Sequence, residues 1–215
     1  MLATSKQAQA LVSFFRSGTK LTYKKGEFII RPNETPSGVF YIEEGIVKAF
    51  DITKYGEENL LIIRKERELF PLLRGITGKG RGVIYQALSH VVVWRIDNEK
   101  YLKFLNENTD AIPPLLDMVL EMYQIHSERI INLEYRSVRE RLISFLLTMS
   151  VRFGTKTDNG VIVDVPLKHQ DIASSINASR ETTNRELSRL EQKGLIAYEQ
   201  SRIVLKDIKT LRTYL

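Results

Sequence analysis

The spacing of apolar residues changes once along the chain, near Asp97, and this change limits the folds available to it. Before that point, short apolar runs alternate with turn residues, as in the strands of a small antiparallel roll or barrel. The runs are Glu27–Ile30, Gly38–Ile42, Ile46–Phe50, Asn59–Ile63, Val83–Ala87 and Val91–Ile96, with the glycine-rich residues 75–82 as a connection. A short amphipathic helix is expected at Lys6–Phe15. After Asp97 the period is helical, so the sequence predicts an α+β fold.

Composition excludes several classes of protein. The 215 residues are 43% hydrophobic and 27% charged, which suits a folded chain of one or two domains. The absence of cysteine rules out disulfides, thiolate iron–sulfur clusters, cysteine-ligated zinc and a cysteine nucleophile. We expect a cytoplasmic protein without a membrane partner, because the start lacks signal-peptide features and no window approaches about 18 apolar residues. A net charge of +6 permits a polyanionic partner.

A long helix is predicted from about Thr109, with Asp110 as its cap and Pro113–Pro114 in its first turn. Six residues recur at alternating steps of three and four, as in the seam of a self-pairing helix: Leu116, Val119, Tyr123, His126, Ile130 and Leu133. A second apolar stripe comprises Leu115, Met118, Met122 and Ile125. The spacing fits packing on the roll, self-pairing, or both.

The most informative stretch, residues 166–208, reads as two short helices and a hairpin. The first helix is expected at Lys168–Ile176, and Asn177 lies where the backbone needs a left-handed residue. Ser179 then caps a second helix, Ser179–Lys193, which stops at Gly194. The inward faces are Ile172, Ala173, Ile176, Thr183, Leu187 and Leu190, and the runs Leu195–Tyr198 and Ile203–Leu205 form a two-stranded wing. This is the spacing of a winged helix-turn-helix.

Three segments are therefore predicted. They are a β-roll effector-type domain at 1–108, a dimerisation helix at 109–136 and a winged helix-turn-helix DNA-binding domain at 137–215. The last begins with a helix at Val138–Phe153, followed by a turn at Thr157–Gly160 and a short strand near Val161–Val165. It carries thirteen basic residues against nine acidic ones, which agrees with binding to DNA.

The second helix of the motif carries polar side chains on its outward face. Arginine can bond guanine O6 and N7 together, and glutamate can accept from cytosine N4 in a major groove. A charged helix face is often only solvated, but the neighbouring turn and wing favour DNA recognition here. Contacts to the DNA backbone or other groups are expected from Lys168, Gln170, Ser179, Thr182, Asn184, Ser188, Arg189 and, at the wing tip, Arg202.

The motif residues closely resemble the signature of the Crp/Fnr family of bacterial transcription regulators. The similar runs are Gln170–Ala173, Ser179–Thr183, Arg185–Leu187, Leu190–Glu191 and Gly194–Ile196. Lys25–Glu27, Gly38–Ile42 and Gly45–Lys48 look like the family's cyclic-nucleotide-type roll, and Gln124–Leu133 looks like its dimerising helix. The resemblance implies a homodimer that reads a palindrome in double-stranded DNA and that works with RNA polymerase. It also matches Arg180, Glu181 and Arg185 to the base-reading positions for TGTGA-like half-sites, while Asn177 replaces the family's turn glycine.

The resemblance weakens at the effector pocket. An ungapped comparison sets Phe70–Pro71 against the Gly-Glu pair that holds ribose in cyclic-AMP-responsive members, and Arg81–Gly82 against the Arg-Ser pair that holds phosphate. Only Arg81 matches, so cyclic AMP is not expected and the effector is unknown. A possible pocket comprises Arg81, Gly82, His126 and Ser127, the last two matching the adenine-contacting positions. An ordinary surface loop at Arg81 and a packed seam histidine at His126 are the alternatives.

The sequence leaves three functions open. The first is a dimeric, sequence-specific DNA-binding transcription regulator, controlled by a ligand in the roll. The second is an effector-independent regulator of the same fold, and the third is a cyclic-nucleotide-like binding module that acts through a protein partner. No cofactor and no metal is expected, because His90, His126 and His169 lack the spacing of a metal or haem site. An enzyme is not expected, because no catalytic motif accompanies the adjacent carboxylates.

Overall fold

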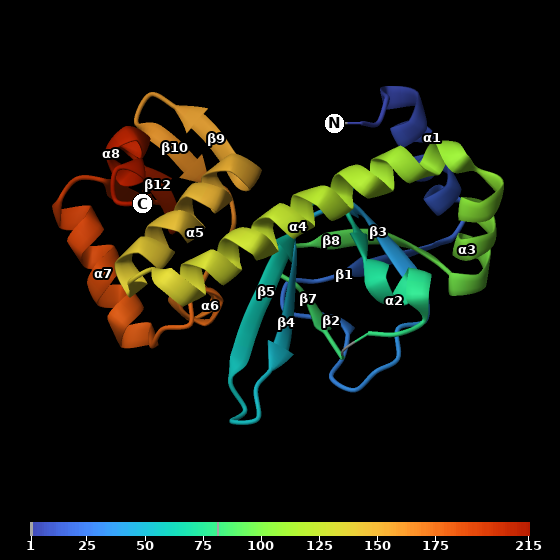
Figure 1. Cartoon of the computed structure of the whole chain (residues 1–215), viewed down its shortest axis with the longest axis horizontal. Helices are drawn as coiled ribbons and strands as arrows, with labels where there is room; N and C mark the ends of the chain where they lie inside the picture. Colours follow the sequence, from blue (N-terminus) through green and yellow to red (C-terminus); the bar gives the residue numbers. More distant parts are fainter. Residues whose placement is uncertain (1, 81) are drawn as a thin grey trace. The chain divides into compact units, whose positions relative to one another are not determined.

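A computed structural model describes residues 2–80 and 82–215 of the chain (Figure 1). The described residues belong to two compact units. The first unit contains Met1–Asp51 and Leu61–Gln124, and the second contains Ile52–Leu60 and Ile125–Leu215. The three-part division at residues 108 and 136 stays a prediction.

The first unit is built on a β-roll, as the sequence predicted. Its two four-stranded sheets have the orders β1-β8-β3-β6 and β2-β7-β4-β5. The strands are β1 (Thr19–Tyr23), β2 (Phe28–Ile30), β3 (Val39–Glu44), β4 (Val47–Ile52), β5 (Glu58–Arg64), β6 (Leu69–Phe70), β7 (Ile84–Ala87) and β8 (Val91–Ile96). β3 lies antiparallel to β8 with Tyr41 opposite Trp94. Two of these strands, β1 and β6, were not among the apolar runs predicted from the sequence.

Helices contribute to the apolar core of this unit. They are α1 (Ser5–Arg16), α2 (Leu72–Thr77), α3 (Asn98–Glu107) and the 3-10 helix η1 (Thr109–Ala111). Phe15 and Tyr101 are fully buried with Val39 and Leu69 in one cluster, and Trp94 packs against that cluster while staying partly exposed. The expected helix at Lys6–Phe15 corresponds to α1, which Thr4 caps through a hydrogen bond from Gln7 N.

The expectation of a simple connection at residues 75–82 was wrong in part, because α2 covers the first three of them. This helix has only six residues, too few to show a helical period in the sequence. Gly75 is required there by packing, since a Cβ at this position would lie 2.3 Å from Cγ2 of Val39. α3 was likewise not distinguished from the long helix that follows it.

The long helix α4 (Ile112–Tyr135) begins after η1, so Asp110 is not its cap as expected. Oδ1 of Asp110 instead accepts a hydrogen bond from Nε2 of Gln7 at 3.1 Å. One face of α4 packs on the roll, where Leu115 is buried and Met118 and Met122 contact the core cluster. Another face carries exposed apolar side chains, which are Leu116, Val119, Tyr123, Ile130 and Leu133.

The second unit holds the helix-turn-helix. Its elements after α4 are α5 (Val138–Phe153), β9 (Gly154–Thr157), β10 (Gly160–Val163), α6 (His169–Ser175), α7 (Arg180–Gln192), β11 (Ile196–Glu199), β12 (Arg202–Leu205) and α8 (Ile208–Arg212). The wing is part of a four-stranded sheet in the order β11-β12-β10-β9, not a two-stranded hairpin. β10 pairs with β12, with Val161 opposite Leu205, so the wing's inner edge is covered. No helix in residues 2–80 and 82–215 is long and apolar enough to cross a membrane.

Candidate nucleic-acid interface

Helix α6 is the first helix of the motif, and its inner face is buried. The backbone N–H of Lys168 donates to Oδ2 of Asp171 at 2.9 Å, which ties down the start of the helix. Ile172 and Ala173 are fully buried. The small side chain of Ala173 suits the close crossing of α6 and α7 that the sequence predicted, and the N–H of Ala178 donates to the carbonyl of Ala173 at 3.0 Å.

The turn between the two helices has the predicted geometry. Asn177 has a φ of 50°, in the left-handed region where asparagine is tolerated better than most residues. Ser179 then caps α7, because its Oγ accepts from the N–H of Thr182 at 3.1 Å. These two residues fix where α7 starts, and therefore which side chains lie at its first turn.

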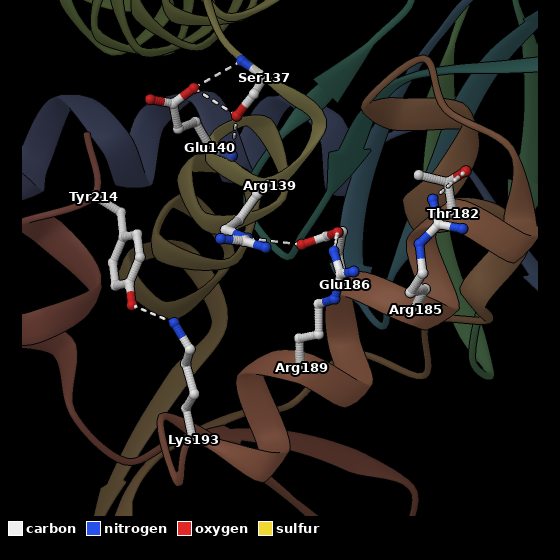
Figure 2. Close-up of polar contacts among 9 residues, drawn as sticks. All are labelled: Ser137, Arg139, Glu140, Thr182, Arg185, Glu186, Arg189, Lys193 and Tyr214. Carbon is white, nitrogen blue, oxygen red and sulfur yellow. Dashed lines mark hydrogen bonds and ion pairs between the residues drawn. The ribbon is translucent and has the colours of Figure 1, made fainter.

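The inner face of α7 is held by apolar packing and by ion pairs. Thr183, Leu187 and Leu190 are buried as predicted. Figure 2 shows Arg139 of α5 reaching Glu186 of α7, with Nε 2.8 Å from Oε2, and Arg189 binding the other carboxylate oxygen. Burial alone would raise the pKa of Glu186, but the hydrogen bonds and charges of Arg139 and Arg189 outweigh it and lower that pKa. Glu186 was not among the predicted site residues.

The outer face of α7 begins with the three predicted base-reading residues. Arg180, Glu181 and Arg185 are all exposed. Nη2 of Arg185 lies 3.4 Å from Oγ1 of Thr182 (Figure 2). Within the described residues, neither Arg180 nor Glu181 forms an ion pair with another side chain. The helix therefore presents donors and an acceptor that the fold itself leaves unused.

Other predicted contact residues are also placed near this face. Lys168, Gln170 and Ser188 are exposed, and Gln170, Ser179 and Arg180 line one cavity of about 800 Å³. Two of the predicted residues have partners inside the unit: Arg189 binds Glu186, and Nε of Arg202 lies 3.0 Å from Oδ1 of Asp164. Arg202 follows the wing turn, where Gln200 and Ser201 have positive φ angles.

His169 was counted in the sequence only as one of three scattered histidines. In the structure its Nδ1 lies 2.6 Å from Oδ1 of Asn184 on α7, and its Nε2 lies 3.4 Å from the hydroxyl of Tyr198 on β11. It thus connects α6, α7 and the wing. No sequence pattern pointed to this role, because the three residues are far apart along the chain.

The comparisons with known proteins agree with this geometry. The Crp-like helix-turn-helix domain family matches residues 140–214, and the cyclic nucleotide-binding domain family matches residues 20–108. The chain belongs to the Crp/Fnr family. It is a DNA-binding transcription regulator of that family and not an enzyme.

Individual relatives are distant but cover most of the chain. The global nitrogen regulator of Synechococcus elongatus is 28% identical over 187 residues, which are 85% of this chain and 83% of the relative. The transcriptional activator protein anr of Pseudomonas aeruginosa is 27% identical over 188 residues, covering 86% and 75%. A solved structure of a CooA variant from Carboxydothermus hydrogenoformans has a TM-score of 0.79 at 19% identity, covering 94% of this chain and 89% of that one, and so shares the fold.

This Crp/Fnr chain has a small cavity in its roll, of about 120 Å³. Its lining is Glu34, Pro36, Arg64, Pro71, Leu72, Leu73, Arg74, Gly80, Gly82, Val83, Tyr85 and Met122. Of the residues predicted to form an effector pocket, Gly82 lines this cavity, and Arg81 lies outside the described residues. His126 and Ser127 belong to the other compact unit, and their place in an effector pocket stays a prediction.

Two arginines that the sequence reasoning missed are part of the cavity wall. Arg64 is 5% exposed, and its Nη1 lies 3.3 Å from Oε2 of Glu68. Its Nε is buried without a hydrogen-bond partner in the described part of the chain. Arg74 comes from α2, the helix that the sequence did not reveal. No group of three or more potential metal ligands occurs among residues 2–80 and 82–215.

Proposed function

We propose that this Crp/Fnr regulator is a homodimer that reads a palindromic, TGTGA-like operator with α7. The observation that carries the proposal is the first turn of α7, where the Ser179 cap is followed by exposed Arg180 and Glu181, with Arg185 one turn later. In this arrangement the two arginines bond guanine edges and Glu181 accepts from cytosine. A cytoplasmic site of action, with RNA polymerase as a further partner, is part of the proposal.

The remaining polar residues of the motif would hold the backbone of the DNA. Lys168, Gln170, Ser179, Thr182, Asn184 and Ser188 lie on or beside α6 and α7 and supply donors for phosphate oxygens. Arg189 and Arg202 would keep their present partners, Glu186 and Asp164, or exchange them for phosphates. Phosphate contacts fix the register of the protein on the duplex, and they make binding dependent on salt.

The dimer is supported by the exposed apolar face of α4. Tyr123 is 71% exposed and Ile130 is 63% exposed, and exposed apolar side chains in a continuous stripe favour a protein partner. The spacing of Leu116, Val119, Tyr123, His126, Ile130 and Leu133 fits a second copy of the same helix. Two copies of α7 would then meet half-sites about one helical turn apart.

The roll cavity supports a regulator that does not use cyclic AMP. Its volume of about 120 Å³ is well below the roughly 300 Å³ at which the usual range of small-molecule pockets begins. Arg64 and Arg74 in its wall suit a much smaller anionic effector. The same small volume also favours the second candidate, a regulator that binds DNA without any effector.

Selection of the ligand-free protein against a random duplex library, at near-physiological salt, tests the proposal. We expect recovery of a TGTGA-like palindrome with nanomolar affinity. Recovery of only weak, sequence-blind binding that falls steeply with salt would contradict it. Calorimetric titration with cyclic AMP should give no binding heat, and saturable binding of that nucleotide would contradict the small-cavity argument.

A further inference from the structure

The corner between α4 and α5 contains buried polar side chains that have no role in the DNA contacts proposed above. Only Arg136 and Ser137 separate the two helices. Asn132 is 9% exposed and Ser144 is 3% exposed. Nδ2 of Asn132 donates to Oγ of Ser144 at 2.9 Å, and this hydroxyl donates to Oε1 of Glu128 at 3.2 Å. The two helices are thus joined by hydrogen bonds with defined directions.

Arg136 contacts two of these side chains, Glu128 and Asn132. Its Nη1 donates to Oε1 of Glu128 at 2.7 Å and also to Oδ1 of Asn132. Glu128 and Asn132 are four residues apart, so they lie along one face of α4. Arg136 directly follows the helix, and its backbone N–H donates to the carbonyl of Asn132 at 3.2 Å. Each of these polar groups has its partner within the corner, so that a change in the angle between the helices would break several hydrogen bonds together.

Arg141 carries the connection onward to the helix-turn-helix. Its Nη1 donates to the carbonyl of Arg136 at 3.3 Å, and its Nη2 donates to the carbonyl of Asn177 at 3.2 Å. Asn177 is the left-handed turn residue that comes two positions before the α7 cap. One guanidinium therefore links the end of α4 to the start of the recognition helix.

Stability alone does not explain why polar side chains occupy this corner. The neighbouring side chains Leu142, Ile143 and Leu146 are fully buried and apolar. Replacing buried polar partners by apolar groups of similar size is often neutral or stabilising, because hydrogen-bonded groups lose their hydration on burial. What the polar partners add is directionality, since hydrogen bonds tolerate only a narrow range of distances and angles.

We propose that Glu128, Asn132, Arg136, Arg141 and Ser144, here called the corner network, are positioning residues that set the orientation of α7 relative to α4. The inference rests on the proposed function, because a dimer paired through α4 reads two half-sites at a fixed spacing only if each α7 keeps one orientation. None of the five residues needs to contact DNA. Their effect is on which spacing between half-sites the dimer accepts.

The first test measures orientation without DNA. The chain has no cysteine, so Glu134→Cys and Ser188→Cys place two spin labels on exposed positions of α4 and α7 alone. Labelled chains mixed with excess unlabelled chains report the distance within one chain. We compare the parent with Asn132→Leu/Ser144→Ala, with Ser144→Ala alone, and with Ser144→Thr, which keeps the hydroxyl.

Ser150→Ala is the matched control, because the Ser150 hydroxyl lies on the same helix and donates within that helix, to the carbonyl of Leu147 at 2.8 Å. We expect a narrow distance distribution in the parent, in Ser144→Thr and in the control. We expect a distribution about twice as broad in the double variant, with a smaller change in Ser144→Ala, while the thermal midpoints stay within a few degrees. An unchanged distribution in the double variant would overturn the inference.

The second test uses the selected operator and versions with one base pair added or removed between half-sites. The parent should bind the altered operators far more weakly than the selected one. In the double variant, the ratio between these two affinities should be about tenfold smaller. Discrimination that is fully kept overturns the inference. If the parent selects no palindrome, the proposed function is contradicted. A broader spin-label distance distribution in the double variant of the first test would still support the role of the corner network.

Discussion

Helices α4 and α7 each leave one face uncovered, but the two faces differ in chemistry. The uncovered face of α4 is apolar and includes Tyr123 and Ile130, whereas that of α7 is polar and begins with Arg180 and Glu181. An apolar face gains by excluding water against a similar face, and a row of unpaired guanidinium groups gains by replacing the counterions of a polyanion. One chain therefore exposes two faces of different chemistry, and substitutions can alter each face separately.

The largest effect is expected from a charge on the apolar face. In a symmetric pair Ile130→Glu buries two carboxylates at once, and an unpaired buried charge costs about 4 kcal/mol. One such charge corresponds to a factor of about a thousand, so the dimer dissociation constant should rise by at least about a thousandfold, as measured by light scattering across a dilution series. Tyr123→Glu should act in the same way.

The matched control is Val151→Glu, which changes an apolar residue of α5 that is 78% exposed. This variant should remain dimeric. A dimeric mass for Ile130→Glu at every concentration would show that the face of α4 does not pair with a second copy.

A smaller effect is expected on the polar face. Arg180→Ala or Arg185→Ala removes one bidentate contact to a base, each worth about 1–3 kcal/mol. Affinity for the selected operator should fall by roughly 5- to 150-fold in anisotropy titrations, while the dimer stays intact. Arg212→Ala removes the same charge from an exposed position on α8 and should change affinity little. Equal losses for all three variants would mean that only net charge matters.

Substitutions in the turn before α7 should change the free energy of unfolding. Asn177→Ala places a residue with a Cβ and no compensating side-chain amide at a φ of 50°, which costs about 1 kcal/mol. Asn177→Gly should be neutral or slightly stabilising at the same position. Urea unfolding followed by circular dichroism measures both, and a stable Asn177→Ala would show that the turn does not hold α7.

The smallest effect is expected from pH. The pKa of Glu186 is lowered in the folded state by Arg139 and Arg189. The stability that this ionised carboxylate adds is therefore present above its unfolded pKa, near 4.5, and is lost as the pH falls through the lower folded pKa. Between about pH 5 and pH 3, the parent should lose more free energy of unfolding than Glu186→Gln does. An identical loss in the two proteins would contradict this assignment.

The helix-turn-helix could be predicted from the sequence because its determinants are local. The bounds of α5 agree with the prediction, and Asn177 and Ser179 occupy the turn and cap positions assigned to them. Each of these features depends on residues within about one helical turn. The four-stranded sheet could not be predicted in the same way, because β10 finds its partner β12 about forty residues later.

The roll cavity was less predictable for the same physical reason. Its wall is assembled from separate segments, and a positional comparison with the family's nucleotide pocket pointed to Arg81 rather than to Arg64 and Arg74. α2 brings Arg74 to the cavity, and this helix depends on the contact between Gly75 and Val39 rather than on its own sequence pattern. The long-range contacts of His169, Glu186 and Arg141 were likewise invisible to local spacing.

Trp94 gives the molecule a built-in optical reporter. It is the only tryptophan in the chain, and it packs on the core cluster of the roll. Its fluorescence therefore follows the first compact unit alone, while far-ultraviolet circular dichroism follows both units together. If the two signals change at different urea concentrations, the roll and the DNA-binding unit unfold as separate cooperative blocks.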